Sequence, residues 1–552
     1  MNPLTGPGPT GDIDVDAVDV CIVGGGPVGL AMAVDLGTRG VRVLLVDEGD
    51  GSVNYPTAES IDTRSMEWLR QLGISDALQR SGFPDDYPRD IAFVTRLAGD
   101  ELVRFDRPTN GQRHLPTGGV SPEGPAWWPK FWFDTALRDR AAELPTVCVR
   151  YQWRCESVDV NSDDEVGVRL AQVGGSSRRV AAKYVVACDG ARSGVRRQLG
   201  IPSEGSQAEA VWVGAFVEIP ELLDRIDLAP AAQYYMLRPR RAIFGSLNGK
   251  DLWRVTYPLR DGEHHDDDEV IATIHASIGQ DDVSVVLRDA REWAGHTVVS
   301  RSYRHGRVFL AGDAAHQMWP SGGHGMNTGI GDVHNLSWKL AAEIRGEAGP
   351  ALLDSYEVER RPVALRNTRR AQHNYLADIA LPTGADLELQ DSAGRAARAD
   401  AEALVTTTRK PEWSSLGVQL GYRYERSPVI VPDGTVEPVD EPTVYVPYCR
   451  PGHRAPHVML PDGRSTLDLF GAGFVLLSTS GSEVPGVWAA TFESVGARLN
   501  VVDVSTPEAR VHYSADLVLV RPDGFVAWMG PANADDVHAV AARVLGWGVP
   551  NR

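Results

Sequence analysis

Three glycines and an aspartate near the N-terminus have the types and spacing of a nucleotide-binding motif. Gly24, Gly26 and Gly29 follow the apolar run VDVCIV, Pro27 suits the first turn of a helix, and Asp47 ends the next apolar run. The first glycine permits a tight turn, the second lets the backbone approach a pyrophosphate, and the third lets the helix pack on the strand. The helix N-terminus favours phosphates, and Asp47 could accept hydrogen bonds from a ribose. We therefore predict dinucleotide binding by a strand, a helix and a second strand.

A second glycine-rich segment, residues 312–332, follows the apolar run RVFLA. Asp313 stands where that predicted strand ends, so its carboxylate could accept hydrogen bonds from the hydroxyls of a polyol. The glycines between residues 322 and 327 remove side-chain obstruction, which lets backbone amides approach a flat polar ring. A helix-like stretch, NLSWKLAAEI, follows. An ordinary nicotinamide-binding fold has no need of this downstream element.

These segments must be positioned by a larger framework, because a chain of 552 residues is long enough for two to four domains. Residues 211–219, 231–247 and 252–258 are enriched in β-branched and aromatic residues, which predicts an antiparallel sheet that roofs a substrate pocket. After about residue 395 the sequence becomes rich in Pro, Thr and Asp, which is typical of a connector. A compact unit with three further strand-like runs and a last helix follows it.

Composition disfavours several functions. The net charge of −19 argues against nucleic acid and anionic membranes as partners. No apolar run approaches the roughly 18 residues that a membrane span needs. The acidic, Pro/Gly-rich N-terminus lacks a signal-peptide pattern, and we expect residues 1–17 to be a disordered tail. The five cysteines are scattered along the chain: Cys21, Cys148, Cys155, Cys188 and Cys449. Their spacing predicts neither a metal site nor a disulfide framework, and it favours a cytoplasmic protein.

Five ordered motifs together carry a resemblance to a known family. The two glycine segments, CDGARSGVR at 188–196, NLSWKLAAEIRG and LLDSYEVERRPVA occur in the order seen in class A FAD-dependent aromatic monooxygenases. This group includes para-hydroxybenzoate hydroxylase, phenol hydroxylases and polyketide hydroxylases, and the resemblance covers most of residues 18–370. The C-terminal unit resembles the thioredoxin-like domain of the larger members. From residue 451 on it contains no cysteine, which excludes thiol–disulfide exchange.

The resemblance implies an α/β fold. It consists of a Rossmann-like FAD-binding domain with an inserted antiparallel-sheet substrate domain, followed by a thioredoxin-like C-terminal domain. The implied boundaries are 18–85, 113–205 and 301–395 for the discontinuous FAD-binding domain, 86–112 and 206–300 for the substrate-binding domain, 396–440 for a linker, and 441–552 for the C-terminal domain.

The resemblance also implies roles for residues at matching positions. The ADP half of FAD would lie on the first glycine motif, Asp313 would hold the ribityl chain and the pyrophosphate side, and the segment 320–327 would lie against the isoalloxazine. Asp189 and Gly190 would serve both FAD and NAD(P)H, and Arg64 would lie near the FAD phosphates. The implied cofactor-binding residues are Gly24, Gly26, Pro27, Gly29, Asp47, Glu48, Arg64, Lys130, Asp189, Gly190, Asp313, Pro320, Gly323, Gly325, Met326 and Asn327.

Two positions depart from the family pattern. Members often carry Glu-Arg at the end of the second strand, where this chain has Asp47 and Glu48. Glu48 brings negative charge to the adenosine end. The family's Pro-Gln before a helix is replaced by Pro129 and Lys130. Lys130 could present a cation to the flavin in place of an amide, or it could be a surface lysine; both readings stay open.

The implied activity is that of an FAD-dependent monooxygenase that consumes NAD(P)H and O₂. It would hydroxylate a phenolic or polycyclic aromatic substrate through a flavin hydroperoxide. One alternative is Baeyer–Villiger-type oxygenation of a related ketone or quinone, since it needs the same motifs. Another is a catalytically silent flavin-binding protein. The expected partners are the small aromatic substrate and O₂, and a homodimer is compatible with this reading.

A phenol is a better nucleophile as its phenolate, so a proton acceptor near its hydroxyl should help. We hypothesise that Glu59 has this role, because related phenol hydroxylases carry a catalytic aspartate five residues before the arginine that corresponds to Arg64. A surface carboxylate in a polar loop is the alternative. Tyr234, Tyr235 and His324 are weaker candidates for contact with the substrate.

Overall fold

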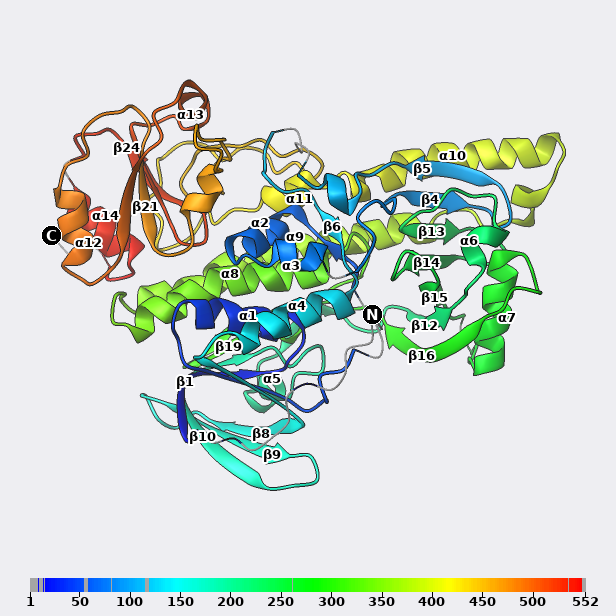
Figure 1. The fold of residues 1–552 in the computed structure, drawn as a ribbon, viewed down its shortest axis with the longest axis horizontal. Coiled ribbons are helices and arrows are strands. Elements are labelled where there is room, and N and C mark those ends of the chain that lie inside the picture. Colours follow the sequence, from blue (N-terminus) through cyan, green and yellow to red (C-terminus); the bar gives the residue numbers. More distant parts are fainter. Residues whose placement is uncertain are drawn as a thin grey trace.

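The computed structural model describes residues 8, 13, 15–53, 58–80, 82–114, 119–260, 262–534 and 536–548. Three sheets, each with its own helices, form three parts of the molecule (Figure 1). Most of the predicted tail, residues 1–17, lies outside the described residues; within it, Ile13 is buried and Ala17 already begins the first strand. Among the described residues no helix has the length and apolarity to cross a membrane.

The first part is an eight-stranded sheet centred on β1 (Ala17–Val23). β1 pairs in parallel with β10 (Ser177–Ala187) and β2 (Val43–Asp47), and β2 pairs in parallel with β7 (Val147–Tyr151). Parallel strands are buried on both faces, which explains the apolar runs at 20–23 in β1 and 43–46 in β2. Four strands complete the sheet: β8 (Trp153–Asp159), β9 (Val166–Gln172), β18 (Arg304–His305) and β19 (Val308–Leu310).

Helices cover this sheet. α1 (Pro27–Thr38) packs against α4 (Lys130–Ala142) and α8 (His324–Ile344), and α8 packs along α9 (Ala351–Ile379). Shorter elements connect these layers: the pair β3 (Ser60–Ile61) and β6 (Ala126–Trp127), the sheet of β11 (Ser203–Ser206), β17 (Thr297–Ser300) and β20 (His316–Gln317), and helices α2 (Thr63–Gln71), α3 (Ser75–Gln79), α5 (Gly194–Gln198) and α11 (Leu416–Leu420).

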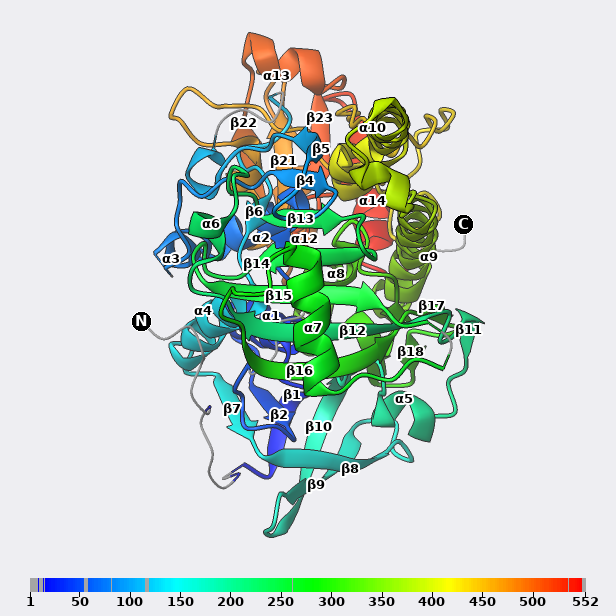
Figure 2. The ribbon, with the colours of Figure 1, turned by 90° about the vertical axis from the view of Figure 1, so that its right-hand side faces the viewer.

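The second part, the middle sheet, has seven strands in the order β16-β12-β15-β14-β13-β4-β5. All neighbours are antiparallel except β13 and β4. Helices α6 (Leu222–Arg225) and α7 (Asp267–Ile278) lie on its outer side (Figure 2). The strands are β4 (Ile91–Val94), β5 (Glu101–Phe105), β12 (Val211–Glu218), β13 (Gln233–Met236), β14 (Ala242–Ser246), β15 (Leu252–Pro258) and β16 (Val286–Ala294).

The predicted linker at 396–440 is wrong in its first half. Residues 392–413 form the helix α10 (Ser392–Trp413), which packs against the middle sheet. Its buried Ala401 and Val405 form a core with Phe93 and Tyr235 of the sheet. Threonines and a late Pro411 resemble connector composition, but burial of one apolar stripe outweighs their weak helix propensity. From residue 421 to 450 the chain contains neither helix nor strand.

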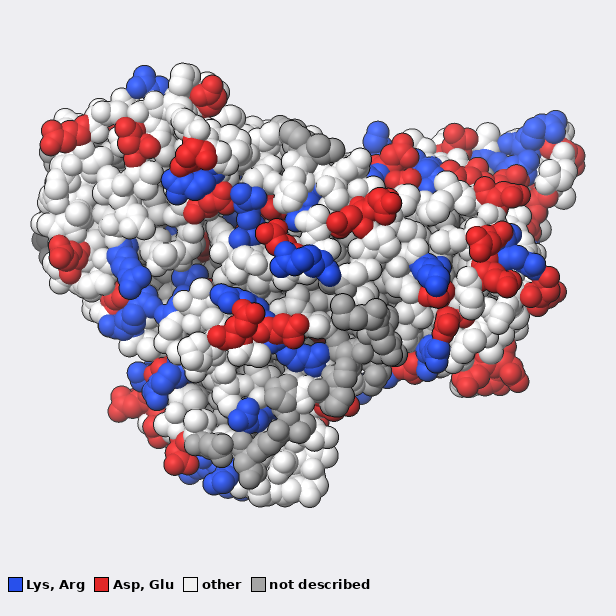
Figure 3. All heavy atoms as spheres, in the orientation of Figure 1, with Lys and Arg blue, Asp and Glu red and all other residues white. Residues whose placement is uncertain are grey.

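The third part is a four-stranded sheet in the order β22-β21-β23-β24. β21 (Phe474–Ser478) is parallel to β22 (Leu499–Asp503) and antiparallel to β23 (Leu517–Val520), which pairs with β24 (Val526–Gly530). This is the strand arrangement of a thioredoxin-like domain. Its helices are α12 (Val487–Glu493), α13 (Pro507–His512) and α14 (Val537–Val544). Across the face in Figure 3, acidic and basic side chains are interspersed.

Candidate flavin site

The first glycine motif forms a tight loop between β1 and α1. Gly24 has a φ of +107°, and a Cβ there would lie 2.3 Å from the carbonyl oxygen of Cys188. A Cβ on Gly29 would lie 1.9 Å from the carbonyl oxygen of Gly24. Both positions therefore exclude any side chain. Gly26, in contrast, faces open space, which leaves room for a ligand against the backbone at the start of α1.

Asp47 is fixed beside this loop. Its carboxylate accepts hydrogen bonds from the backbone N–H of Gly25 at 2.6 Å and of Gly49 at 2.7 Å. The next residue, Glu48, is exposed. A residue that we did not predict, Tyr151, lies opposite Asp47 at the end of the neighbouring strand β7. Its ring lies 3.0 Å from where a Gly25 Cβ would be, so it walls the loop.

The segment after β10 lies against the same loop. The backbone N–H of Cys188 donates to the carbonyl of Val23 at 2.7 Å. Asp189 accepts a hydrogen bond from the Val195 N–H at 3.1 Å through Oδ2, whereas its Oδ1 is buried and has no partner among the described residues. Gly190 has a φ of +75° and open space around it. An unsatisfied acceptor next to an open glycine fits a ligand that donates hydrogen bonds.

The second glycine segment begins with a turn that a buried ion cluster positions. Asp332 accepts hydrogen bonds from the N–H of Gly312 at 3.1 Å and from Nε of Arg360 at 2.9 Å, and its Oδ2 lies 2.8 Å from Nε2 of His316. Burial opposes its charge, but His316 and Arg360 hold the pKa of Asp332 below its usual value. Asp313 beside it is exposed and, within the described chain, accepts no hydrogen bond.

Sequence reasoning missed Asp332 and Arg360. The only signal was their place in the motifs GIGD and EVERRP, because nothing in the spacing shows that residues 28 positions apart share a buried pair.

The loop at 320–327 leads into the N-terminus of α8. Gly322 and Gly323 have φ values of +91° and +67°, and Pro320 is exposed. Asn327 ties the loop to β3 and α2, since its amide donates to the carbonyl of Ser60 at 3.1 Å and accepts from the Asp62 N–H at 3.0 Å. Gly325 and Met326 are partly buried on the first turn of α8. The free N–H groups of a helix N-terminus favour an electron-rich ligand there.

Glu59 and Lys130 lie at the β3–β6 pair. Glu59 is buried, which removes the reading of a surface carboxylate, and it forms a two-point ion pair with Arg254 of the middle sheet, with Nη2 of Arg254 3.0 Å from Oε2. The ammonium of Lys130 is committed to Asp134 one turn along α4. Burial raises the pKa of Asp134, although Lys130 opposes this.

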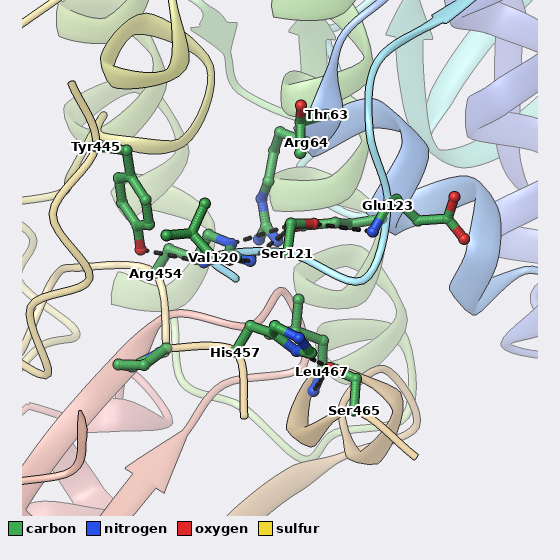
Figure 4. A network of polar contacts seen from close by, with 12 residues as sticks. Thr63, Arg64, Val120, Ser121, Glu123, Tyr445, Arg454, His457, Ser465 and Leu467 are labelled. Carbon is green, nitrogen blue, oxygen red and sulfur yellow. Dashed lines mark hydrogen bonds and ion pairs between the residues drawn. The ribbon is translucent and has the colours of Figure 1, made fainter. Parts of the chain in front are cut away.

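Arg64 lies at the junction with the C-terminal domain. Its guanidinium donates to Glu67 at 2.8 Å and to the carbonyl of Asp523 in the C-terminal domain at 2.6 Å. Arg454 of that domain also binds Glu67, so that the three side chains join the two domains. Figure 4 shows Arg64 and Arg454 in this network of polar contacts. Burial opposes the charge of Glu67, but the two arginines lower its pKa to about 2.

The three candidate substrate residues lie in different parts of the structure. Tyr234 is fully buried in the core on the α7 side of the middle sheet, and its hydroxyl donates to the Ala229 carbonyl at 2.8 Å. The prediction of a substrate contact there is wrong, because the strand turns this side chain away from the flavin loops. Tyr235 faces the opposite way and stacks on Phe93 with ring centroids 4.7 Å apart. His324 is buried on α8, and burial together with Arg370 and Arg366 lowers its pKa to about 4.

The residues present fit FAD. The loop at Gly26 is open to a pyrophosphate, and Asp47 stands at the ribose position. Asp313 offers a free carboxylate to a polyol, and the loop at 322–327 exposes backbone to a ring. A parallel sheet with this double glycine site, joined to a separate antiparallel sheet, defines a flavin-dependent oxygenase.

Comparisons with known proteins give the family. A family model described as "FAD binding domain" matches residues 17–371, and one described as "Aromatic-ring hydroxylase, C-terminal" matches residues 449–547. The chain belongs to the FAD-dependent aromatic-ring hydroxylases, and its cofactor is FAD. The expected fold class and the expected enzyme class, a flavoprotein monooxygenase, are thereby confirmed.

Individual relatives and solved structures are consistent with this family. The chain is 32% identical to aklavinone 12-hydroxylase RdmE of Streptomyces purpurascens, over 96% of this chain and 97% of that protein. The structure of the rebeccamycin biosynthetic enzyme RebC with reduced flavin has a TM-score of 0.89 and 34% identity, covering 97% of this chain and 100% of RebC. A ternary complex of aklavinone-11 hydroxylase with FAD and aklavinone has a TM-score of 0.82 and 30% identity, with coverage of 97% and 100%.

Proposed function

We propose that this monooxygenase hydroxylates a polycyclic phenolic compound. The observation that carries the proposal is the buried Glu59–Arg254 pair, which joins the flavin domain to the inner face of the middle sheet. Phe216 lies opposite Arg254 in the register of β12 and β15, and Gln233 and Tyr235 lie on the same face. A relative whose structure holds FAD and aklavinone supports a multi-ring aromatic substrate.

The residues of this chain have separable tasks. The glycine loop and Asp47 hold the ADP half of FAD, and Asp313 with the 322–327 loop hold its flavin half. Bound FAD, reduced by NAD(P)H, supplies the oxygen-activating chemistry. The middle sheet covers the site and excludes water.

Glu59 accepts the proton of the substrate hydroxyl. Arg254 holds that carboxylate in place, and each of its oxygens retains a lone pair for a further donor. The resulting phenolate is the more reactive nucleophile.

The test is NADH and NADPH oxidation by the FAD-loaded protein, with and without a panel of phenols and polycyclic quinols. We expect one compound to stimulate oxidation strongly and to gain one oxygen atom with its rings intact. Ring expansion or opening would assign Baeyer–Villiger oxygenation instead. Bound FAD without oxidation of either nucleotide under any condition would favour a catalytically silent flavin-binding protein.

We also propose that the protein works in the cytoplasm. This rests on its cysteines, all five of which are free thiols, as a reducing compartment keeps them.

A further inference from the structure

Two arginines face each other at the edge of the middle sheet. In the β4–β5 register Ile91 pairs with Phe105, so the same register extended by two residues sets Arg89 opposite Arg107. Like charges directly opposite each other on neighbouring strands repel. Such an arrangement persists where something else compensates the charge.

Both guanidinium groups have buried donors without an acceptor among the described residues. Arg89 is 1% exposed and its Nη1 donates to the carbonyl of Pro125, but its Nε and Nη2 have no acceptor in the described part of the chain. Nη1 of Arg107 is also buried without an acceptor there. The indole Nε1 of Trp413, at the end of α10, is a further buried donor without a partner among these residues. Buried donors are rarely left unpaired, and Arg89, Arg107 and Trp413 all lack a hydrogen-bond acceptor for these donors.

Within the residues that the structure describes, no nearby carboxylate neutralises the pair. Asp90, next to Arg89 in the sequence, favours the charge of Arg107, but its oxygens bind Nη1 of Arg104 at 3.1 Å and the backbone N–H of Arg107 at 3.0 Å. Asp106, next to Arg107, is exposed. Burial and the neighbouring Arg107 lower the pKa of Arg89 well below its usual value, and burial lowers the pKa of Arg107 to about 10. The site is therefore short of negative charge.

The surroundings are aromatic and belong to the inner face of the sheet. The guanidinium carbon of Arg107 lies 5.7 Å from the ring centroid of Trp413, and that ring lies 6.1 Å from the ring of Tyr235. Arg89 reaches Pro125 next to β6, and β6 pairs with β3 one residue from Glu59. The pair thus contacts the segment before β6 on one side and the end of α10 on the other.

We infer that Arg89, Arg107 and the Trp413 N–H bind the carboxylate of an aromatic acid, and that the substrate carries this group. The inference rests on the proposed function and narrows its substrate class. A planar carboxylate matches guanidinium forks, and the neighbouring rings suit an aromatic body better than a phosphate ester. The phenol to be hydroxylated and the carboxylate would then be held at opposite ends of one molecule.

The experiment measures binding of 2-naphthoate and of its neutral isostere 2-naphthamide to the FAD-loaded protein by calorimetry. We expect the wild-type protein to bind naphthoate at least tenfold more tightly than naphthamide. Arg89→Gln and Arg107→Gln should each remove this preference and leave naphthamide binding unchanged, while Arg89→Lys keeps part of it. Arg154→Gln, which changes an exposed arginine of β8, is the matched control.

Equal affinity of the wild-type protein for both compounds would overturn the inference. So would inorganic phosphate that competes with naphthoate at equal affinity, because the site would then be a general anion site. FAD content and circular dichroism show whether each variant folds, and Arg89→Lys remains informative if a Gln variant does not. Retained FAD with stimulated NAD(P)H oxidation by neutral phenols alone would reject the carboxylate and keep the proposed monooxygenase.

Discussion

Replacement of Glu67 by Gln should strongly destabilise the junction between the flavin domain and the C-terminal domain. The Glu67 carboxylate is buried and accepts hydrogen bonds from Arg454 at 2.5 and 3.0 Å, from Arg64 at 2.8 Å and from Ser121 at 2.6 Å. A neutral amide leaves two buried guanidinium groups without their counter-charge. Breaking one side of a buried ion pair typically costs about 3–5 kcal/mol.

The pKa of Glu67 gives an independent magnitude. Its folded pKa of about 2 lies below the ordinary glutamate value of 4.5. A depressed carboxyl pKa stabilises the folded state above the unfolded pKa, and this contribution disappears as pH falls through the folded pKa. At pH 7 the difference corresponds to about 3 kcal/mol, and at pH 3.5 to about 2 kcal/mol. The free-energy cost expected from breaking the ion pair and the one expected from the pKa of Glu67 agree in size.

The assay is urea unfolding of the FAD-loaded protein, followed by flavin and tryptophan fluorescence at pH 7 and at pH 3.5. Glu143→Gln is the control, because Glu143 forms an exposed pair with Arg140 on α4 whose loss should cost less than about 0.5 kcal/mol. A Glu67→Gln penalty as small as that of the control, or one that does not shrink at the lower pH, would refute the reasoning.

Three further predictions concern the flavin site. Gly29→Ala should abolish FAD retention, measured by the flavin-to-protein absorbance ratio, whereas Gly26→Ala should fold and only weaken FAD binding; equal behaviour of both would contradict the glycine geometry. Glu59→Gln should lower coupled hydroxylation by on the order of 10²-fold at unchanged FAD content, and an unaltered rate across pH would remove Glu59 as the proton acceptor. The pKa of His324 is depressed to about 4 in the folded state, so folding stability should fall from pH 6.5 to 4 by about 3 kcal/mol. His324→Asn should remove this loss in a melting-temperature profile, and His305→Asn, on an exposed histidine, should not.

Local features of the molecule follow from short stretches of the sequence. The glycine spacing predicted the β1–α1 loop, because a tight turn and close packing impose steric demands on single positions. The short apolar runs predicted parallel buried strands, and segments enriched in β-branched and aromatic residues predicted the middle sheet. Each of these depends on residues within one or two neighbouring elements.

Pairing between distant segments could only come from the tertiary structure. Glu59 and Arg254 are 195 positions apart, and Arg64 reaches the carbonyl of a residue 459 positions away. The period of a strand shows that Tyr234 and Tyr235 face opposite sides, but only the packing of α7 and α10 decides which core each side chain joins. The sequence by itself therefore determined the cofactor loops, whose geometry is local. The fold decided which charges meet and which arginine donors, among the described residues, stay without an acceptor, because these depend on how separate elements pack.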